Sequence, residues 1–179
     1  MEVNPKTRRR NLLERNYTLT LVGLFLVMCF ASNALAQDES APPPLKMISK
    51  TERMQLAEKT QPKEYTVLAL QLMDTRLRSA EKLSTDENYS LMYAELGGFQ
   101  ALMDTTLSFL LKSRSDEGRQ LNSLKKFEIG LRTFSPRLEA IRRETPSNFE
   151  HYVKYLIRYV SDTREKAMQP FFSDTVISN

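Results

Sequence analysis

The sequence predicts an all-α protein, an antiparallel up-and-down bundle of four long helices preceded by a short N-terminal helix. Three observations lead to this prediction. Apolar residues recur at alternating spacings of three and four along most of the chain after residue 48, which is the period of one helix face. No stretch shows the alternation of a strand. The connections between the periodic runs are short, so consecutive helices must run antiparallel.

Two helices are expected on either side of Pro62. Only three apolar residues mark a face on the short helix predicted over about 49–60. Pro62 lies near the first turn of the next helix, predicted over 63–83, where its missing N–H is not needed. This helix carries two adjacent apolar stripes, one formed by Tyr65, Leu68 and Leu72 and the other by Leu70, Met73, Leu77 and Ala80.

The third long segment is predicted to be the central helix because its apolar face is wide and long. Thr85 or Asp86 can cap its start. Gly97 and Gly98 lie within the repeat, where their small size favours close helix packing. The face comprises Tyr89, Met92, Leu96, Phe99, Met103, Thr106 and Leu110, and is widened by Leu102, Leu107 and Phe109.

The last two long helices continue the same alternation. The apolar face of the first is formed by Leu124, Phe127, Leu131, Phe134, Leu138 and Ile141, and that of the second by Phe149, Val153, Leu156, Val160, Thr163 and Ala167. Thr145 and Pro146 predict the start of the final helix, with the threonine as cap and the proline in the first turn. Pro136 removes one backbone hydrogen bond inside its helix, so we expect a kink near residues 133–135.

The first 36 residues have the pattern of an export signal. Basic residues precede an apolar run from Leu19 to Ala31, and the small residues ending at Ala36 predict cleavage before Gln37. The run is shorter than the roughly 20 residues that a spanning helix needs, so cleavage is favoured over an uncleaved membrane anchor. We therefore expect a periplasmic or secreted protein. The Arg9-Arg10 pair leaves twin-arginine export as the alternative to the ordinary route.

These features divide the chain into four parts. Residues 1–36 are the signal, 37–47 a flexible proline-rich tether, 48–172 the helical bundle domain, and 173–179 a disordered tail. The single cysteine, Cys29, lies in the signal, so the mature chain cannot form an internal disulfide.

The charge of the chain argues against nucleic-acid binding. The sequence holds 26 Lys and Arg and 22 Asp and Glu, but five of the basic and two of the acidic residues lie in the first 36. The mature chain is therefore nearly neutral and has no global attraction for phosphate backbones. Membrane contact is expected only through the signal before cleavage.

No catalytic, cofactor or metal motif is found in the sequence. Di-iron bundles need two Glu-x-x-His pairs, whereas this chain has one histidine, His151. If Val153 and Leu156 face the core, His151 points away from it, which argues against a haem held by His and Met. Nucleophile elbows, phosphate loops and dinucleotide fingerprints are missing as well. We therefore expect no enzymatic activity and no cofactor.

The last two helices carry the candidate binding residues. Tyrosines line one side of the final helix, and arginines decorate both helices. The candidate partner-binding residues are Arg142, Arg143, Tyr152, Tyr155, Arg158 and Tyr159. A basic, aromatic face suits an acidic protein, anionic lipid headgroups or a cell-wall polymer. The alternative is that the tyrosine rings pack on the bundle and the charges only solubilise the helices.

These observations predict a non-enzymatic exported protein that binds an unidentified protein partner or an envelope component. One alternative is a bundle that carries a ligand or cofactor in a pocket near Pro136 and the Gly97-Gly98 pair. Another is self-association, because exposed heptad edges can pair with a second copy as readily as with a different protein.

Overall fold

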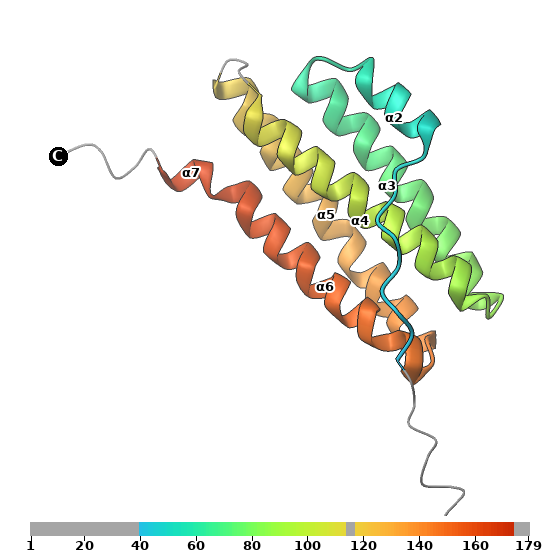
Figure 1. Cartoon of the computed structure of the whole chain (residues 1–179). Coiled ribbons are helices and arrows are strands. Elements are labelled where there is room, and N and C mark those ends of the chain that lie inside the picture. Colours follow the sequence, from blue (N-terminus) through green and yellow to red (C-terminus); the bar gives the residue numbers. More distant parts are fainter. Residues whose placement is uncertain (1–39, 114–116, 174–179) are drawn as a thin grey trace, which may run out of the picture. The chain divides into compact units, whose positions relative to one another are not determined.

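The computed structural model describes residues 40–113 and 117–173 and confirms the all-α bundle (Figure 1). Its elements are α2 (Lys50–Ala57), α3 (Pro62–Thr85), α4 (Tyr89–Lys112), α5 (Glu117–Glu144), α6 (Ser147–Met168) and the single turn α7 (Pro170–Ser173). The expected signal, its cleavage site between Ala36 and Gln37, and residues 174–179 lie outside the described residues. Within the described ranges, no helix is both long and apolar enough to cross a membrane.

The N-terminal end of α3 agrees with the prediction from the sequence, whereas that of α4 differs from it. α3 begins at Pro62, as expected, because proline needs no hydrogen-bond acceptor in the first turn. The cap of α4 is Asn88, whose side chain accepts a hydrogen bond from the N–H of Leu91 at 3.4 Å, rather than Thr85 or Asp86. Glu87, with φ of 56°, reverses the chain and so moves the helix start past both predicted caps.

The junction of α5 and α6 also differs from the prediction. The buried Thr145 hydroxyl donates to the carbonyl of Ile141 at 2.7 Å, so it closes the end of α5 instead of capping α6. Pro146 occupies the cap position of α6, with φ of −59° and ψ of 156°, and supplies no side-chain hydrogen bond. Pro136 lies on the exposed side of α5, which is helical from Glu117 to Glu144. The kink near Pro136 stays a prediction.

The order of the helices around the bundle is α3, α4, α6, α5. α3 packs against both α4 and α5, and α5 packs against α6. Consecutive helices run antiparallel, and as a result α4 and α6 are parallel neighbours. Tyr93 on α4 meets Phe149 on α6, and further along both helices Asp104 meets Tyr159. In Figure 1, α4 lies in front of α5, with α3 and α6 on either side.

The predicted apolar stripes supply most of the core, although Leu68, Leu70 and Leu72 on α3 are only half-buried at its edge. Phe99 on α4 packs edge to face on Phe134 of α5, with ring centroids 5.5 Å apart. All six stripe residues of α5 are buried, and five of the six on α6 are buried, with Phe149 half-buried. Because each fully buried Leu or Phe contributes about 1.5–3 kcal/mol, these stripes supply the main stabilisation of the bundle.

Residues 40–48, which we call the strap, lie extended along the bundle. Figure 1 shows the strap running from the start of α6 across α4 to α2. The N–H of Ala41 donates to the carbonyl of Asn148 at 2.8 Å, and Ser40 Oγ lies 2.7 Å from His151 Nδ1. The composition of this segment predicts a flexible tether, and gives no reason to expect this packing.

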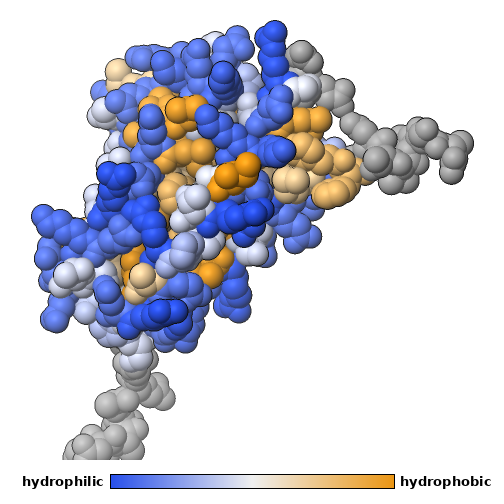
Figure 2. All heavy atoms as spheres, turned by 180° about the vertical axis from the view of Figure 1, so that it is seen from behind, coloured by the Kyte–Doolittle hydropathy of each residue, from blue (hydrophilic) through white to orange (hydrophobic). Residues whose placement is uncertain are grey.

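The opposite face of the bundle has a more ordinary surface. Figure 2 shows it mostly hydrophilic, with separate hydrophobic patches. Exposed hydrophobic residues on α5 and α7 include Ile129 and Phe172, which are 50% and 65% exposed. Exposed apolar residues and small patches of this kind are common on the surface of monomeric proteins.

Candidate binding surface along α4

α4 has two opposite faces of different composition. The face buried in the core consists of large side chains, including Met92, Leu96 and Phe99. The opposite face carries small residues at spacings of three or four, and we call it the small-residue stripe. Its members are Ser90, Ala94, Gly97, Ala101, Thr105 and Ser108. A helix face in contact with water alone would be expected to carry long charged side chains.

Gly97 lets the strap approach the stripe closely. A Cβ atom at this position would lie 2.4 Å from the carbonyl oxygen of Leu45 and 3.2 Å from Cβ of Pro44. Any other residue would therefore push the strap away from α4. The close packing expected at Gly97 is present, although its partner is the extended strap and not another helix.

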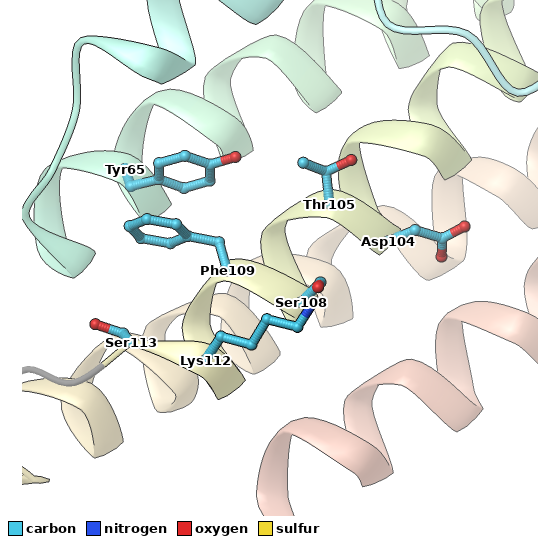
Figure 3. Close-up of a pocket in the computed structure, with 7 residues that line it drawn as sticks. All are labelled: Tyr65, Asp104, Thr105, Ser108, Phe109, Lys112 and Ser113. Atoms are coloured by element: carbon cyan, nitrogen blue, oxygen red, sulfur yellow. The ribbon is translucent and has the colours of Figure 1, made fainter.

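Three hollows border the small-residue stripe. The strap hollow, of about 610 Å³, lies between the strap and the first half of α4 and is lined by residues that include Pro44, Tyr93 and Phe149. The middle hollow, of about 490 Å³, lies beside Lys46 and Arg53. The Tyr65 hollow, of about 540 Å³, lies at the end of α4 (Figure 3). Stripe residues line all three hollows, so the concave parts of this surface follow α4.

The Tyr65 hollow combines an aromatic wall with polar groups. The Tyr65 ring from α3 stacks on the Phe109 ring at a centroid distance of 3.8 Å and an interplanar angle of 12°. Figure 3 shows Thr105 of the stripe beside this pair, with Asp104 pointing away from it. Burial raises the pKa of the Tyr65 phenol, so it stays a neutral hydrogen-bonding group at ordinary pH. Such a wall suits binding, because aromatic faces beside a few polar groups are typical of ligand sites.

Arg76 on α3 lines the strap hollow and is held in place by two carboxylates. Arg76 donates to both carboxylate oxygens of Glu52 on α2, at 2.8 and 2.7 Å, and to Glu95 on α4 at 3.0 Å. The hydrogen bonds to Glu52 are the main cause of a raised Arg76 pKa. Burial opposes ionisation of Glu52, but hydrogen bonds from Arg76 and Ser49 outweigh it and lower its pKa. Arg76 and Glu52 are therefore both charged, and their ion pair holds α2 against α3.

A tyrosine ladder connects α6 to α4. The rings of Tyr152 and Tyr155 are 6.0 Å apart, and those of Tyr155 and Tyr159 are 5.6 Å apart. The buried Tyr152 hydroxyl donates to Gln100 Oε1 at 3.0 Å, and Gln100 Nε2 donates to the Tyr155 hydroxyl at 3.3 Å. The Tyr159 hydroxyl donates to Asp104 Oδ1 at 2.8 Å. The parallel pair α4 and α6 is thus joined by polar contacts.

The protonation of the ladder indicates a structural role. Burial raises the pKa of Tyr152, and burial together with the hydrogen-bonded Asp104 raises that of Tyr159 to about 12. Both phenols therefore remain protonated donors at neutral pH and are poorly suited to act as bases. Lys46 of the strap lies over the Tyr159 ring, 5.5 Å from its centroid, which is within cation–π range.

The structure brings together only some of the candidate residues from the sequence. The three tyrosines form the ladder, but Tyr152 is 2% exposed and cannot contact a partner directly. Arg142 pairs with Glu139 and Glu150, both at 2.7 Å, and so joins α5 to α6. A charge reversal at Arg142 would therefore alter the bundle as well as any binding.

The remaining candidates are exposed. Arg143 and Arg158 make no ion pair within residues 40–113 and 117–173. His151 is exposed too, as its expected position on the outer side of α6 requires. No group of three or more His, Cys, Asp or Glu side chains placed to hold a metal occurs in the described part of the chain.

Sequence reasoning missed the small-residue stripe, although its signal was present. The spacing of Ser90, Ala94 and Gly97 has the same helical period as the core stripe, shifted to the opposite face. The strap had no comparable signal, because an extended segment without periodicity does not identify the surface that it covers. No known protein family, curated protein or solved structure matches this chain.

Proposed function

We propose that this chain is an exported, non-enzymatic helical-bundle protein that binds a protein partner or an envelope component through the outer face of α4. The observation that carries the proposal is the small-residue stripe with three hollows along it. Small side chains let a second backbone approach a helix closely, and the strap already does so at Gly97. The polar groups at the hollows supply the orientation that a specific contact needs.

The surface combines features that favour a partner over plain solvation. Leu45 and Met47 at the rim of the strap hollow are 77% and 64% exposed. Thr105 and Ser108 are exposed and lie between the aromatic Tyr65 wall and the middle hollow. An apolar rim next to hydroxyl groups is typical of interface cores bordered by polar contacts.

Site-specific photo-crosslinking in the exported fraction tests this proposal. A photoreactive residue at Thr105 is expected to capture a discrete partner, whereas the same residue at the exposed Ala140 on α5 is expected not to. Adding Ser108→Arg should abolish capture at Thr105, because a long charged side chain would fill the stripe. Equal capture from Thr105 and Ala140 would contradict the proposed surface.

The export part of the proposal needs its own measurement. Amino-terminal sequencing of the protein recovered from outside the cytoplasm is expected to begin at Gln37. A sequence that begins at the initiator methionine would contradict cleavage and favour a retained anchor.

A second function, the carriage of a small apolar ligand, is favoured by the strap hollow. Its walls include Pro42, Pro43, Leu45, Tyr93 and Phe149, and its volume of about 610 Å³ falls within the range of small-molecule sites. Native mass spectrometry separates the two functions. Mass in excess of the mature polypeptide that is lost on unfolding would support carriage, whereas the polypeptide mass alone would leave partner binding as the function.

A further inference from the structure

The strap lies extended on the bundle, from the start of α6 across α4 to α2 (Figure 1). It contacts α4 at Gly97 and α6 at Asn148 and Tyr159, and we call this contact surface the α4–α6 groove. The contacts of the strap with α6 begin near the start of that helix, where Ser40 meets His151 and Ala41 meets Asn148, and end farther along it, where Lys46 lies over Tyr159. From residue 41 to residue 46, an extended proline-rich chain advances about 15 Å at 3.1 Å per residue. From 148 to 159, a helix advances about 16 Å at 1.5 Å per residue. The two lengths are similar, so an extended strap can span the distance between its first and last contacts with α6.

The groove has the features of a site for proline-rich peptides. Pro42, Pro43 and Pro44 line the same hollow as the aromatic residues Tyr93 and Phe149. Aromatic-lined grooves bind proline-rich segments because such segments are extended before binding and lose little entropy. Gly97 lets the backbone of the strap approach the backbone of α4 closely. The ring of Tyr159 contacts the ammonium group of Lys46, which follows Leu45 in the strap.

The strap is held by few polar contacts. Among the described residues, a single backbone hydrogen bond, from Ala41 to Asn148, joins it to α4 or α6. The three prolines have no N–H to donate. Leu45 and Met47 point largely into solvent. A segment attached in this way can be replaced by another peptide of the same chemistry without disturbing the helices.

We propose that the α4–α6 groove is a recognition site for an extended, proline-rich segment of a protein partner, and that the strap occupies this site within the chain. The inference rests on the proposed partner-binding function and names the chemistry of the partner: a small residue, consecutive prolines, an apolar residue and a cation. Covalent linkage gives the strap an effective concentration on the order of millimolar. A free segment of equal affinity must therefore reach that concentration to displace the strap, and a partner at lower concentration must bind the groove more tightly than the strap does or be held by a second contact.

The test uses the chain produced with its N-terminal segment intact and purified as the cell delivers it. In a strap-loosened variant, Pro42, Pro43, Pro44 and Leu45 are replaced by Gly, Ser, Gly and Ser. The probe is a fluorescent peptide with the sequence of residues 40–48. We expect the variant to bind the probe at least about tenfold more tightly than the wild type does, because the strap no longer competes.

Two further variants locate the binding. Gly97→Leu in the strap-loosened chain should weaken probe binding at least about tenfold, since its side chain would occupy the groove. Ala140→Leu, on the exposed side of α5, should leave binding unchanged. A folded strap-loosened variant that does not bind the probe, or that binds a Gly-Ser peptide equally well, would overturn the inference.

A measurement on the wild type covers the case in which the loosened variant does not fold. Excess peptide should speed hydrogen exchange of the Ala41 amide, which is protected by its bond to Asn148. Unchanged exchange at peptide concentrations above the millimolar range would overturn the inference. A wild-type dimer that exchanges straps would assign the groove to a second copy and also overturn it. Capture of a partner at Thr105 without peptide binding would remove this inference and leave the proposed function standing.

Discussion

The guanidinium of Arg137 on α5 donates hydrogen bonds to both carboxylate oxygens of Glu81 on α3, from Nε at 2.6 Å and from Nη2 at 2.7 Å. Its Nη1 also donates to Asp74 at 2.6 Å. Because one planar group serves two carboxylates on the neighbouring helix, these bonds define the register of the parallel pair α3 and α5.

We expect Arg137→Lys to lower the free energy of unfolding by about 1 kcal/mol, because a single ammonium group cannot reproduce the two-pronged contact with Glu81. Urea unfolding followed by circular dichroism measures this change. Arg78→Lys is the matched control: Arg78 is exposed and pairs with Asp74 on its own helix, so the change should stay within about 0.5 kcal/mol. Equal losses in both variants would contradict the importance of the α3–α5 contact.

Ser84→Ala should stabilise the protein. The Ser84 side chain is buried, and its hydroxyl has no hydrogen-bond partner among the described residues. Removing this unpaired group should raise the free energy of unfolding by about 1–2 kcal/mol, because its desolvation no longer opposes folding. Ser79→Ala, at a half-buried position of the same helix, is the comparison, and the difference in helix propensity should change stability there by about 0.5 kcal/mol. A destabilised Ser84→Ala protein would refute this reading of the hydroxyl.

Tyr152→Phe should destabilise the bundle more than Tyr155→Phe. Loss of the Tyr152 hydroxyl leaves Oε1 of the fully buried Gln100 without its partner, at a cost of about 1–3 kcal/mol. Tyr155 is 39% exposed, so water can replace its hydroxyl at smaller cost. Thermal or urea unfolding of the two variants gives the comparison. The reverse order of stability would show that the bond from Tyr152 to Gln100 matters less than the bond from Gln100 to Tyr155.

Acid should weaken the contact between α5 and α6 through Glu128. This carboxylate is 6% exposed and accepts hydrogen bonds from Arg164 at 3.0 and 2.8 Å and from Arg132 at 3.0 Å. Burial opposes its ionisation, but the arginine hydrogen bonds outweigh burial and lower its pKa. Its stabilisation is thus present above the unfolded-state pKa of about 4.3 and is lost as the pH falls through the lower folded-state value.

Glu128→Gln tests this pH dependence. Below about pH 4.3, unfolding free energy should fall less steeply in the variant than in the wild type, because one depressed carboxyl group has been removed. Part of the slope should remain, since Glu52 also has a lowered pKa. Urea unfolding at a series of acidic pH values gives both slopes. Parallel curves for variant and wild type would contradict the role of Glu128.

Gly97→Ala should release the strap while leaving the helices folded. Alanine favours the helix by about 1 kcal/mol, but its Cβ would lie 2.4 Å from the Leu45 carbonyl oxygen and the strap must move. We expect faster hydrogen exchange at Ala41 with little loss of overall stability. Ser90→Ala, elsewhere on the small-residue stripe, should not change that exchange. Unaltered protection of Ala41 in Gly97→Ala would show that the strap is not held by close approach to α4.

The core could be predicted from the sequence because its signal is local. A helix that buries one face must repeat its apolar residues every three or four positions, and the six residues from Leu124 to Ile141 do so without interruption. Helix caps were less predictable. Thr85, Asp86 and Asn88 are all capping residues within one turn, and the left-handed conformation of Glu87 decides among them.

The candidate site was largely beyond sequence reasoning because its contacts join distant parts of the chain. The spacing of Tyr152, Tyr155 and Tyr159 predicted a shared side of α6, and the ladder confirms that they lie together. The spacing of the tyrosines did not show that this side of α6 faces Gln100 and Asp104 on α4. Nor did the spacing of the arginines reveal that Arg142 is engaged by two glutamates.

The attachment of the strap sets the order in which the molecule can be completed. Ser40 and its partner His151 are 111 residues apart in the chain, and synthesis starts at the amino end. The strap is made before the long helices, but it can bind only after α6 has been made and has packed beside α4. Until that moment residues 40–48 stay uncovered, because the part of their contact surface that lies on α6 has not yet been made.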